Sequence, residues 1–283
     1  MLLFDNLDKG WPARQVEERD IRTAHHLIEC LNKMERELRR SGVKFEYLLF
    51  LRSDVYDNLV AATADRAKFN LIRIDWSDPE QLQTLLRERV ISNVEAAKAG
   101  KAWEATNPVL PDGTTAMKRM IENSLMRPRF LIELCEKAIS FAINRQHEAV
   151  TANDVEDALK QQSLFLVSDF AYELRDVAGL TEGLFYKFIG KGDTFTPQEI
   201  IEIIGPVSVS PDRVIDLLVW YGFLGIPGAD GRPIFIYDRY YDMRRLEADK
   251  ARQADDLLYV VNPAFFARVV EVSTVRERSD LRR

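Results

Sequence analysis

Carboxylates follow an apolar run at the very start of the sequence. Residues 2–4 read Leu-Leu-Phe, and Asp5, Asn6 and Asp8 come directly after them. Such a run is typical of a buried strand, so the polar residues mark its C-terminal end. An enzyme that hydrolyses nucleoside triphosphates needs a carboxylate there to hold Mg²⁺ near the β and γ phosphates, and Asp5 meets that need. The alternative is that Asp5 only ends the strand and Asp8 only caps the next turn.

The attacking water in such a reaction needs a residue that orients it. Asn6 stands where a second acid usually follows, and an amide can orient water by hydrogen bonding but cannot take its proton. Asp8 is the next carboxylate along the chain. Asn6 and Asp8 are therefore both candidates for contact with the water.

Two arginines extend this chemistry. Arg52 follows the apolar run 48–51, and ligands of open α/β sheets bind at the carboxyl ends of strands, so Arg52 and Asp5 are expected at one crevice. Arg52 could there neutralise a γ-phosphate, or it could pair only with an acid such as Asp54. Arg129 lies in the first turn of a predicted helix, where a cation opposes the helix dipole. That placement indicates an anionic partner, unless Arg129 is an ordinary solvated arginine.

The elements that must position these residues alternate between strand and helix. After the first strand, the sequence predicts a helix over 17–40, a strand over 45–51, a helix over 53–60 and a strand over 71–76. This order predicts a parallel sheet with right-handed crossovers. Because the sheet begins at its Mg²⁺-binding strand, we expect one open, apolar edge where a further strand belongs.

The rest of the chain changes character twice. From Asp78 to about Gln162 the pattern is helical, which predicts an all-helical unit. Shorter segments follow: a helix over 170–189, helices that begin with capping residues at Thr196 and Ser210, strands over 232–237 and 258–261, and a helix-prone stretch over 239–256. Three helices followed by two strands is the winged-helix order.

The predicted fold class is therefore an α/β core with a parallel sheet, followed by an all-α unit and a C-terminal winged-helix domain. The expected boundaries are 1–77 for the core, 78–162 for the helical unit, 163–270 for the winged helix and 271–283 for a charged tail.

The winged helix would contact a partner through its second helix and its wing. The recognition-helix candidate covers 211–223, with Arg213 outward, and Arg232 and Arg239 lie in the wing. Neighbouring aspartates leave this surface close to neutral, whereas a DNA reader should carry net positive charge. Duplex DNA and a protein are both expected as candidate partners, and charge favours the protein.

Composition limits the remaining classes. The net charge is only -6, so any nucleic-acid contact must be local. Cys30 and Cys135 form no ligand pair and are expected as reduced core residues of a cytoplasmic protein. His25, His26 and His147 are expected as ordinary helix residues without metal-ligand partners. No apolar run reaches the roughly 20 residues that span a bilayer, so no membrane contact is expected.

A family resemblance joins these segments. Residues 4–11, Phe-Asp-Asn-Leu-Asp-Lys-Gly-Trp, resemble the Walker B region of bacterial AAA+/STAND-type P-loop ATPases. Residues 51–54 resemble their sensor-1 strand end, and 70–89 resemble the last core strand and the first helix of the lid. Residues 127–158 are similar to the sensor-2 helix and the following helix of the origin-recognition-like branch. Winged-helix modules commonly follow such lids.

The resemblance implies ATP and Mg²⁺ as cofactors and assigns roles residue by residue. It implies Asp5 for Mg²⁺, Asn6 or Asp8 for the attacking water, Arg52 as sensor 1, Arg129 as sensor 2, and Arg66 near the place of an arginine finger.

The phosphate-binding loop of that family is missing from the sequence. Gly-x-x-x-x-Gly-Lys-Ser/Thr occurs nowhere in the 283 residues. That loop supplies most phosphate contacts, so this chain alone should bind and hydrolyse ATP very poorly. We expect a truncated, split or degenerate ATPase whose partner is a segment or subunit that carries the loop. The competing hypothesis is a non-catalytic DNA-binding or protein-interaction module on an ATPase-like scaffold.

Overall fold

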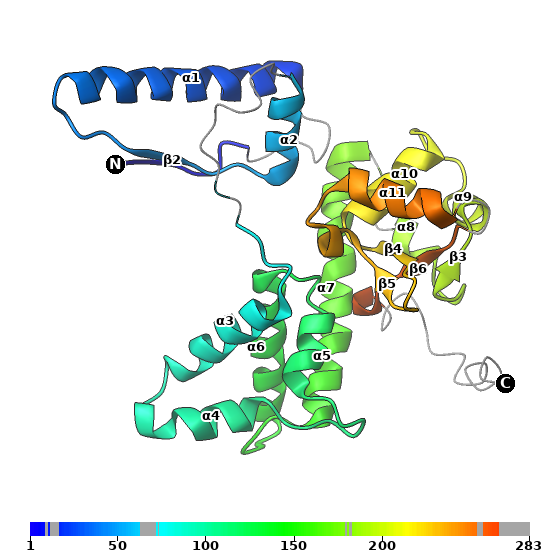
Figure 1. Cartoon of the computed structure of the whole chain (residues 1–283). Helices are drawn as coiled ribbons and strands as arrows, with labels where there is room; N and C mark the ends of the chain where they lie inside the picture. Colours follow the sequence, from blue (N-terminus) through cyan, green and yellow to red (C-terminus); the bar gives the residue numbers. More distant parts are fainter. Residues whose placement is uncertain are drawn as a thin grey trace. The chain divides into compact units, whose positions relative to one another are not determined.

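The computed structural model describes residues 1–8, 11, 17–62, 72, 74–178, 180, 183–253 and 257–265. They belong to two compact units, residues 1–73 and residues 74–283, and each unit is treated by itself below. The described residues are rich in helix, with a two-stranded parallel sheet in the first unit and a four-stranded sheet in the second (Figure 1).

The first unit has the predicted order of strand, helix, strand and helix. Its elements are β1 (Leu2–Phe4), α1 (Glu18–Arg40), β2 (Tyr47–Leu49) and α2 (Ser53–Ala62). The strands pair in parallel, with Leu3 opposite Leu48, which confirms the predicted direction. Helix α1 forms where the 3.6-residue pattern predicts it, because its apolar stripe packs against α2 and β2 (Figure 1). The buried residues of this core are Ile21, Ala24, Ile28 and Leu59.

The prediction of a buried first strand is wrong, because Leu2 and Leu3 are both exposed and only Phe4 is partly buried. Leu3 is 60% exposed and Leu48 is 46% exposed, and Met1 and Phe50 are exposed beside them. Residues that are paired in register point to the same side of a sheet, so these side chains share one face. The helical core packs against Leu49 on the other face, where Leu2 remains 43% exposed, and the described residues of the unit leave the face of Leu3 and Leu48 uncovered.

The described residues of the third predicted strand, 71–76, do not form a strand. Residue 72 and residues 74–76 have no strand assignment, and residues 71 and 73 lie outside the described residues. The second strand is also shorter than the predicted 45–51.

The second unit begins with the predicted helical region. It contains α3 (Pro79–Ile91), η1 (Ala96–Lys98), α4 (Ala99–Thr106), α5 (Ala116–Glu122), α6 (Pro128–Asn144) and α7 (Ala152–Ala178). The predicted end of this region at Gln162 is wrong, because α7 continues for four more turns. Phe170, in that continuation, packs 5.4 Å from Tyr221 and 5.6 Å from Phe265 between ring centroids. Helix α7 therefore belongs to the helical core and to the C-terminal core alike.

The C-terminal part combines short helices with an antiparallel sheet. Its elements are α8 (Gly183–Tyr186), β3 (Thr194–Phe195), α9 (Pro197–Ile204), α10 (Pro211–Trp220), β4 (Leu224–Pro227), β5 (Pro233–Ile234), η2 (Ile236–Arg239), α11 (Met243–Gln253), β6 (Tyr259–Val261) and η4 (Pro263–Phe265). The strand order is β3-β6-β4-β5. Four phenylalanines in mutual contact fill the space beneath the sheet: Phe185, Phe188, Phe223 and Phe265.

The strand predicted over 232–237 is shorter than expected. It ends after Ile234, because the carboxylate of Asp238 accepts a hydrogen bond from the backbone N–H of Phe235 at 2.7 Å and closes a turn of 3₁₀ helix. The helix-prone stretch over 239–256 does contain a helix, α11. Strands β3 and β4 were not predicted, since runs of two and four residues carry too little alternation.

The two predicted capping residues differ in the structure. Thr196 accepts a hydrogen bond from the N–H of Glu199 at 3.2 Å, and the Glu199 carboxylate accepts one from the N–H of Thr196 at 2.7 Å. Ser210 makes no capping bond from its side chain. We expect Thr196→Ala to lower the free energy of unfolding by about 1 kcal/mol. Ser210→Ala, the matched control in urea unfolding, should cost clearly less, and equal losses would contradict the capping box.

Candidate functional site

Asp5 is exposed at the end of β1. Its Oδ1 accepts a hydrogen bond from the backbone N–H of Asn6 at 2.8 Å, and Asn6 adopts a left-handed φ of 58°. The chain turns sharply here and leaves the Asp5 carboxylate at the surface. A hard cation could reach this oxygen donor.

Asp8 is a buried carboxylate that binds the residue after β2. Its Oδ2 accepts a hydrogen bond from the backbone N–H of Arg52 at 2.8 Å and lies 3.9 Å from Nε of the same arginine. Arg52 Nη1 also donates to the carbonyl of Trp11 at 2.8 Å. Asp8 thus fixes the place of Arg52. The predicted alternative, in which Arg52 pairs with Asp54, involves a side chain outside the described residues.

Asp8 is enclosed by these contacts. It is 8% exposed and already engaged by Arg52, so it is poorly placed to accept a proton from a surface water. Its contacts hold the backbone and the side chain of Arg52. Of the two candidates for the attacking water, Asn6 is the exposed one.

Asp5 and Arg52 follow two strands that run in parallel, so they lie at the same edge of the sheet. Proteins commonly hold Mg²⁺ with one or two carboxylates, and waters and substrate phosphates complete the octahedron. A single exposed carboxylate such as Asp5 fits that pattern in donor type. It fits only in the presence of a phosphate ligand, because Asp5 alone offers too few oxygens.

Arg129 belongs to the second unit, and its surroundings there are clear. It lies in the first turn of α6, its side chain is 79% exposed, and its Nε lies 3.4 Å from Oε1 of Glu133. Burial raises the pKa of Asp169 on α7, while the charges of Arg129 and Arg127 oppose that shift. Arg129 is thus an exposed cation beside two acids. Arg66, the arginine-finger candidate, lies outside the described residues.

Two of the three arginines that were predicted to contact a partner are partly buried. Arg239 forms an ion pair with Asp249 at 2.5 Å and is 30% exposed. One nitrogen of Arg213, Nη2, is buried. Arg232 is 88% exposed, with Asp230 at 3.7 Å. Arg213, predicted to point outward, is therefore partly enclosed, and Arg232 is the most exposed of the three. Their contact with a partner stays a prediction.

The recognition-helix candidate is buried on more sides than predicted. Besides the expected inner face, Ile215, Val219 and Trp220 of α10 are also buried. Asp216, on the same helix, lies 3.8 Å from Nζ of Lys250 on α11. A helix that reads DNA needs a free face in the groove, and most of α10 is covered.

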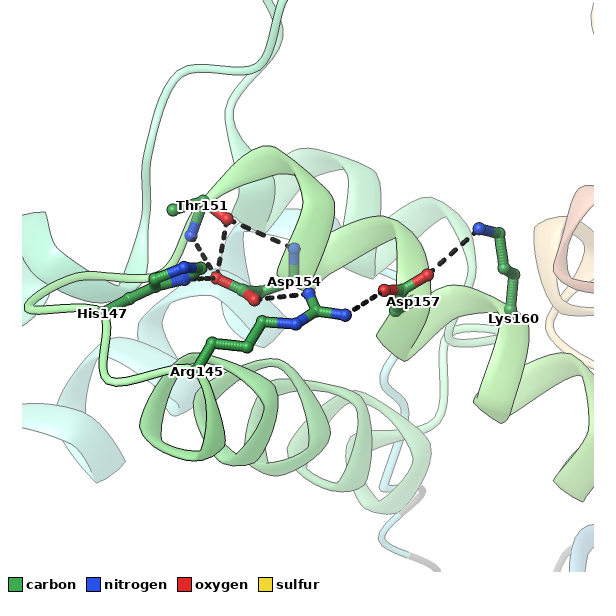
Figure 2. Close-up of polar contacts among 6 residues, drawn as sticks. All are labelled: Arg145, His147, Thr151, Asp154, Asp157 and Lys160. Atoms are coloured by element: carbon green, nitrogen blue, oxygen red, sulfur yellow. Dashed lines mark hydrogen bonds and ion pairs between the residues drawn. The ribbon is translucent and has the colours of Figure 1, made fainter.

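A dense polar cluster ties α6 to α7 (Figure 2). Asp154 is fully buried and receives hydrogen bonds from three partners: Arg145 Nη1 at 2.8 Å, the N–H and hydroxyl of Thr151 at 2.9 and 2.7 Å, and a contact with His147 Nδ1 at 2.8 Å. Figure 2 shows the Arg145 guanidinium between Asp154 and Asp157, which lies 2.5 Å from Nη2.

The cluster is a structural lock. A hollow of about 400 Å³ adjoins it, lined by Arg145, His147, Asn153, Glu156, Asp157 and Lys160. Arg145 and Lys160 are each bound to a carboxylate, so the hollow offers no excess of positive charge to an anion. Burial by itself would raise the pKa of Asp154, but the hydrogen bonds from Thr151, His147 and Arg145 lower it far below its usual range.

Two groups escaped prediction from the sequence. Thr151 and Asp154 have the spacing of a capping box, a signal that could have identified the lock. His25 and His26 were expected to lack ligand partners, yet both approach Glu29 on α1. The i,i+4 and i,i+3 spacings could have shown this. Of the two cysteines expected in cores, Cys135 is buried and Cys30 is exposed.

The helical region of this chain matches a known protein family. Residues 80–171 match the FunZ-associated C-terminal helical domain, a stretch that runs from α3 into α7. A transposon gamma-delta 80.3 kDa protein of Escherichia coli (strain K12) is 23% identical over 181 residues, which are 62% of this chain and 25% of that protein. The chain thus spans about a quarter of the length of this relative.

Among solved structures, a variant of RuvB from Thermotoga maritima matches with a TM-score of 0.35 and 17% identity, over 78% of this chain and 65% of that one. No described helix is both long and apolar enough to cross a bilayer.

Proposed function

We propose that this chain is the C-terminal part of an ATP-dependent switch of the AAA+/STAND P-loop type, which binds Mg²⁺ and ATP only when a segment or subunit supplies the phosphate-binding loop. One observation carries the proposal: exposed Asp5 and Asp8-bound Arg52 follow two parallel strands at one edge of a sheet. In this role Asp5 would hold Mg²⁺, Asn6 would orient water, and Arg52 would contact the γ-phosphate. Asp8 would keep Arg52 in place.

The uncovered face of the small sheet supports a missing partner. Leu3, Leu48, Met1 and Phe50 expose apolar surface that a complete α/β core would cover with a second layer. The proposed occupant is the strand-and-helix segment that contains Gly-x-x-x-x-Gly-Lys-Ser/Thr. Burying these side chains would give association a hydrophobic driving force in addition to the nucleotide contacts.

The second unit would report the state of the nucleotide. We assign residues 78–178 to a lid, extended from the predicted boundary to the end of α7, with Arg129 as its contact to the phosphates. The short helices and antiparallel sheet that follow would form a winged-helix module. The pairing of Arg239 and the burial of α10 favour a protein as its partner over DNA.

Titration with labelled ATP and Mg²⁺ tests this proposal. The untagged chain alone should show no saturable binding, whereas the chain mixed with a polypeptide that carries the phosphate loop should bind and slowly hydrolyse ATP. Asp5→Asn should lower the hydrolysis rate of that mixture by roughly 100-fold, since it removes the Mg²⁺ ligand. Asp20→Asn, which changes an acid on α1 away from the strand ends, should leave the rate unchanged.

Absence of binding both alone and in the mixture would end the switch hypothesis. The alternative is a non-catalytic module on a degenerate ATPase scaffold, and the exposure of Arg232 is the observation that keeps DNA within its reach. Salt-dependent binding of duplex DNA that Arg232→Ala abolishes would favour that alternative.

A further inference from the structure

Two imidazoles and a carboxylate come together on α1. Nδ1 of His25 lies 3.7 Å from Oε2 of Glu29, and Nδ1 of His26 lies 3.4 Å from the same oxygen. The centroids of the two imidazole rings are 5.8 Å apart, and the ring planes are inclined by 63°. One ligand atom from each of the three residues lies within 4.8 Å of the others. Three donor groups thus converge on one small volume.

The helix itself creates this convergence. Residues three and four apart are neighbours on a helix surface, so His26 and His25 both reach Glu29. Ala24 and Ile28 of the same helix are buried in the core and anchor its opposite stripe. The three polar side chains are therefore held beside the core on a helix of 23 residues. Their backbone positions need no rearrangement to keep the three groups together.

The donor set matches zinc. Zn²⁺ prefers imidazole nitrogen and carboxylate oxygen at about 2.0–2.2 Å, and two ligands of a tetrahedral ion at that distance are about 3.3–3.5 Å apart. The separations of 3.4 and 3.7 Å from Glu29 are close to this value. We propose that His25, His26 and Glu29 form a Zn²⁺ site, with water in the fourth position.

Two neighbouring cations of α1 pair with acids other than Glu29. Arg22 lies 3.5 Å from Glu18, and Lys33 lies 4.0 Å from Glu37, so the neighbouring cations have other acidic partners. Cys30 is exposed and follows Glu29, but its thiol is not among the three converging ligand atoms. The ligand set is therefore two histidines and one glutamate, without the thiolate.

Competition between the untagged, chelator-treated chain and a chromophoric zinc chelator tests the site. The wild-type chain should bind one equivalent of Zn²⁺. His26→Ala and Glu29→Gln should each weaken binding at least about tenfold, because loss of even an outer-shell partner costs 10–100-fold in metal affinity. Glu37→Gln is the matched control, because Glu37 is another exposed acid of α1. This variant should bind Zn²⁺ as the wild type does. Far-UV circular dichroism checks that every variant keeps its helix content.

Two further measurements fix the ligand set and separate this proposal from the nucleotide site. Cys30→Ser should keep the wild-type affinity, and the Co²⁺-loaded chain should lack a thiolate-to-cobalt charge-transfer band. Asp5→Asn should also bind Zn²⁺ normally. The proposal is wrong if the wild type fails to compete for one equivalent, if Glu29→Gln retains full affinity, or if Cys30→Ser abolishes binding.

Discussion

Asp154→Ala is expected to lower the free energy of unfolding of the second unit by roughly 2–4 kcal/mol, because it removes a buried acceptor of several hydrogen bonds, one of which caps a helix. The carboxylate has no exposure to solvent and is bound by Arg145, His147 and Thr151. Its removal leaves the backbone N–H and hydroxyl of Thr151 and one nitrogen of Arg145 without their acceptor, although Arg145 keeps its ion pair with Asp157. Loss of the capping bond at the start of α7 adds to the cost.

Asp157→Ala is the control for this prediction. Asp157 binds the same Arg145 and also Lys160, but its side chain is 30% exposed, so water can replace it. Exposed pairs of this kind contribute about 0–1 kcal/mol. Urea unfolding followed by circular dichroism should therefore show a much larger loss for Asp154→Ala than for Asp157→Ala. Equal losses would mean that the Asp154 lock is not formed as described.

The lock also has a pH signature. The pKa of Asp154 is lowered in the folded chain relative to an unfolded aspartate, so the folded state binds this proton more weakly. The resulting stabilisation is fully present above the unfolded value of about 3.9 and is lost as the pH falls through the folded value. Asp154→Asn lacks this titration. The stability difference between wild type and Asp154→Asn should thus be largest near neutral pH and should shrink below about pH 4.

The helices could be predicted because their signals are local. The stripe through Ile21, Ala24 and Ile28 predicts α1, and those side chains are the buried ones. The parallel direction of β1 and β2 followed from the long helix between them, since a connection of that kind crosses the sheet. Each inference used neighbours within about one turn or one crossover of the chain.

The wrong predictions concern features that depend on contacts between residues distant in sequence. Helix α7 continues past Gln162 because Phe170 finds Tyr221 and Phe265, residues about 50 and 95 positions away in a core that no local pattern reveals. Arg239 was predicted as a partner contact in the wing, and its ion pair with Asp249, on a helix that begins at Met243, left no signal near Arg239 in the sequence.

The candidate site was predicted in part for the same reason. Asp5 and Arg52 lie at one edge, since strand direction is readable from the order of elements. The engagement of Asp8 by the backbone of Arg52 was not foreseen, because a hydrogen bond across 44 residues leaves no spacing signal. Asn6 is exposed and Asp8 is buried in the structure. The sequence alone does not show which of these two polar residues is accessible to water.

Gly225→Ala is expected to lower the free energy of unfolding by about 1–3 kcal/mol, because it adds a methyl group where the packing has no room. Gly225 lies in β4, between β6 and β5, and a Cβ built on it would be 2.6 Å from the carbonyl oxygen of Ile234 and 2.6 Å from the ring of Phe235. The carbonyl is backbone and the ring is 4% exposed, so neither can move aside cheaply.

Gly100→Ala makes the same chemical change with the opposite expected sign. Gly100 lies in α4, and its added methyl group would have nothing within 4 Å, so the higher helix propensity of alanine should stabilise the unit by up to about 1 kcal/mol. Urea unfolding of the two variants should therefore move in opposite directions from the wild type. A neutral Gly225→Ala would show that β5 and Phe235 do not close over β4, and the proposed wing would lose the packing that holds its two strands together.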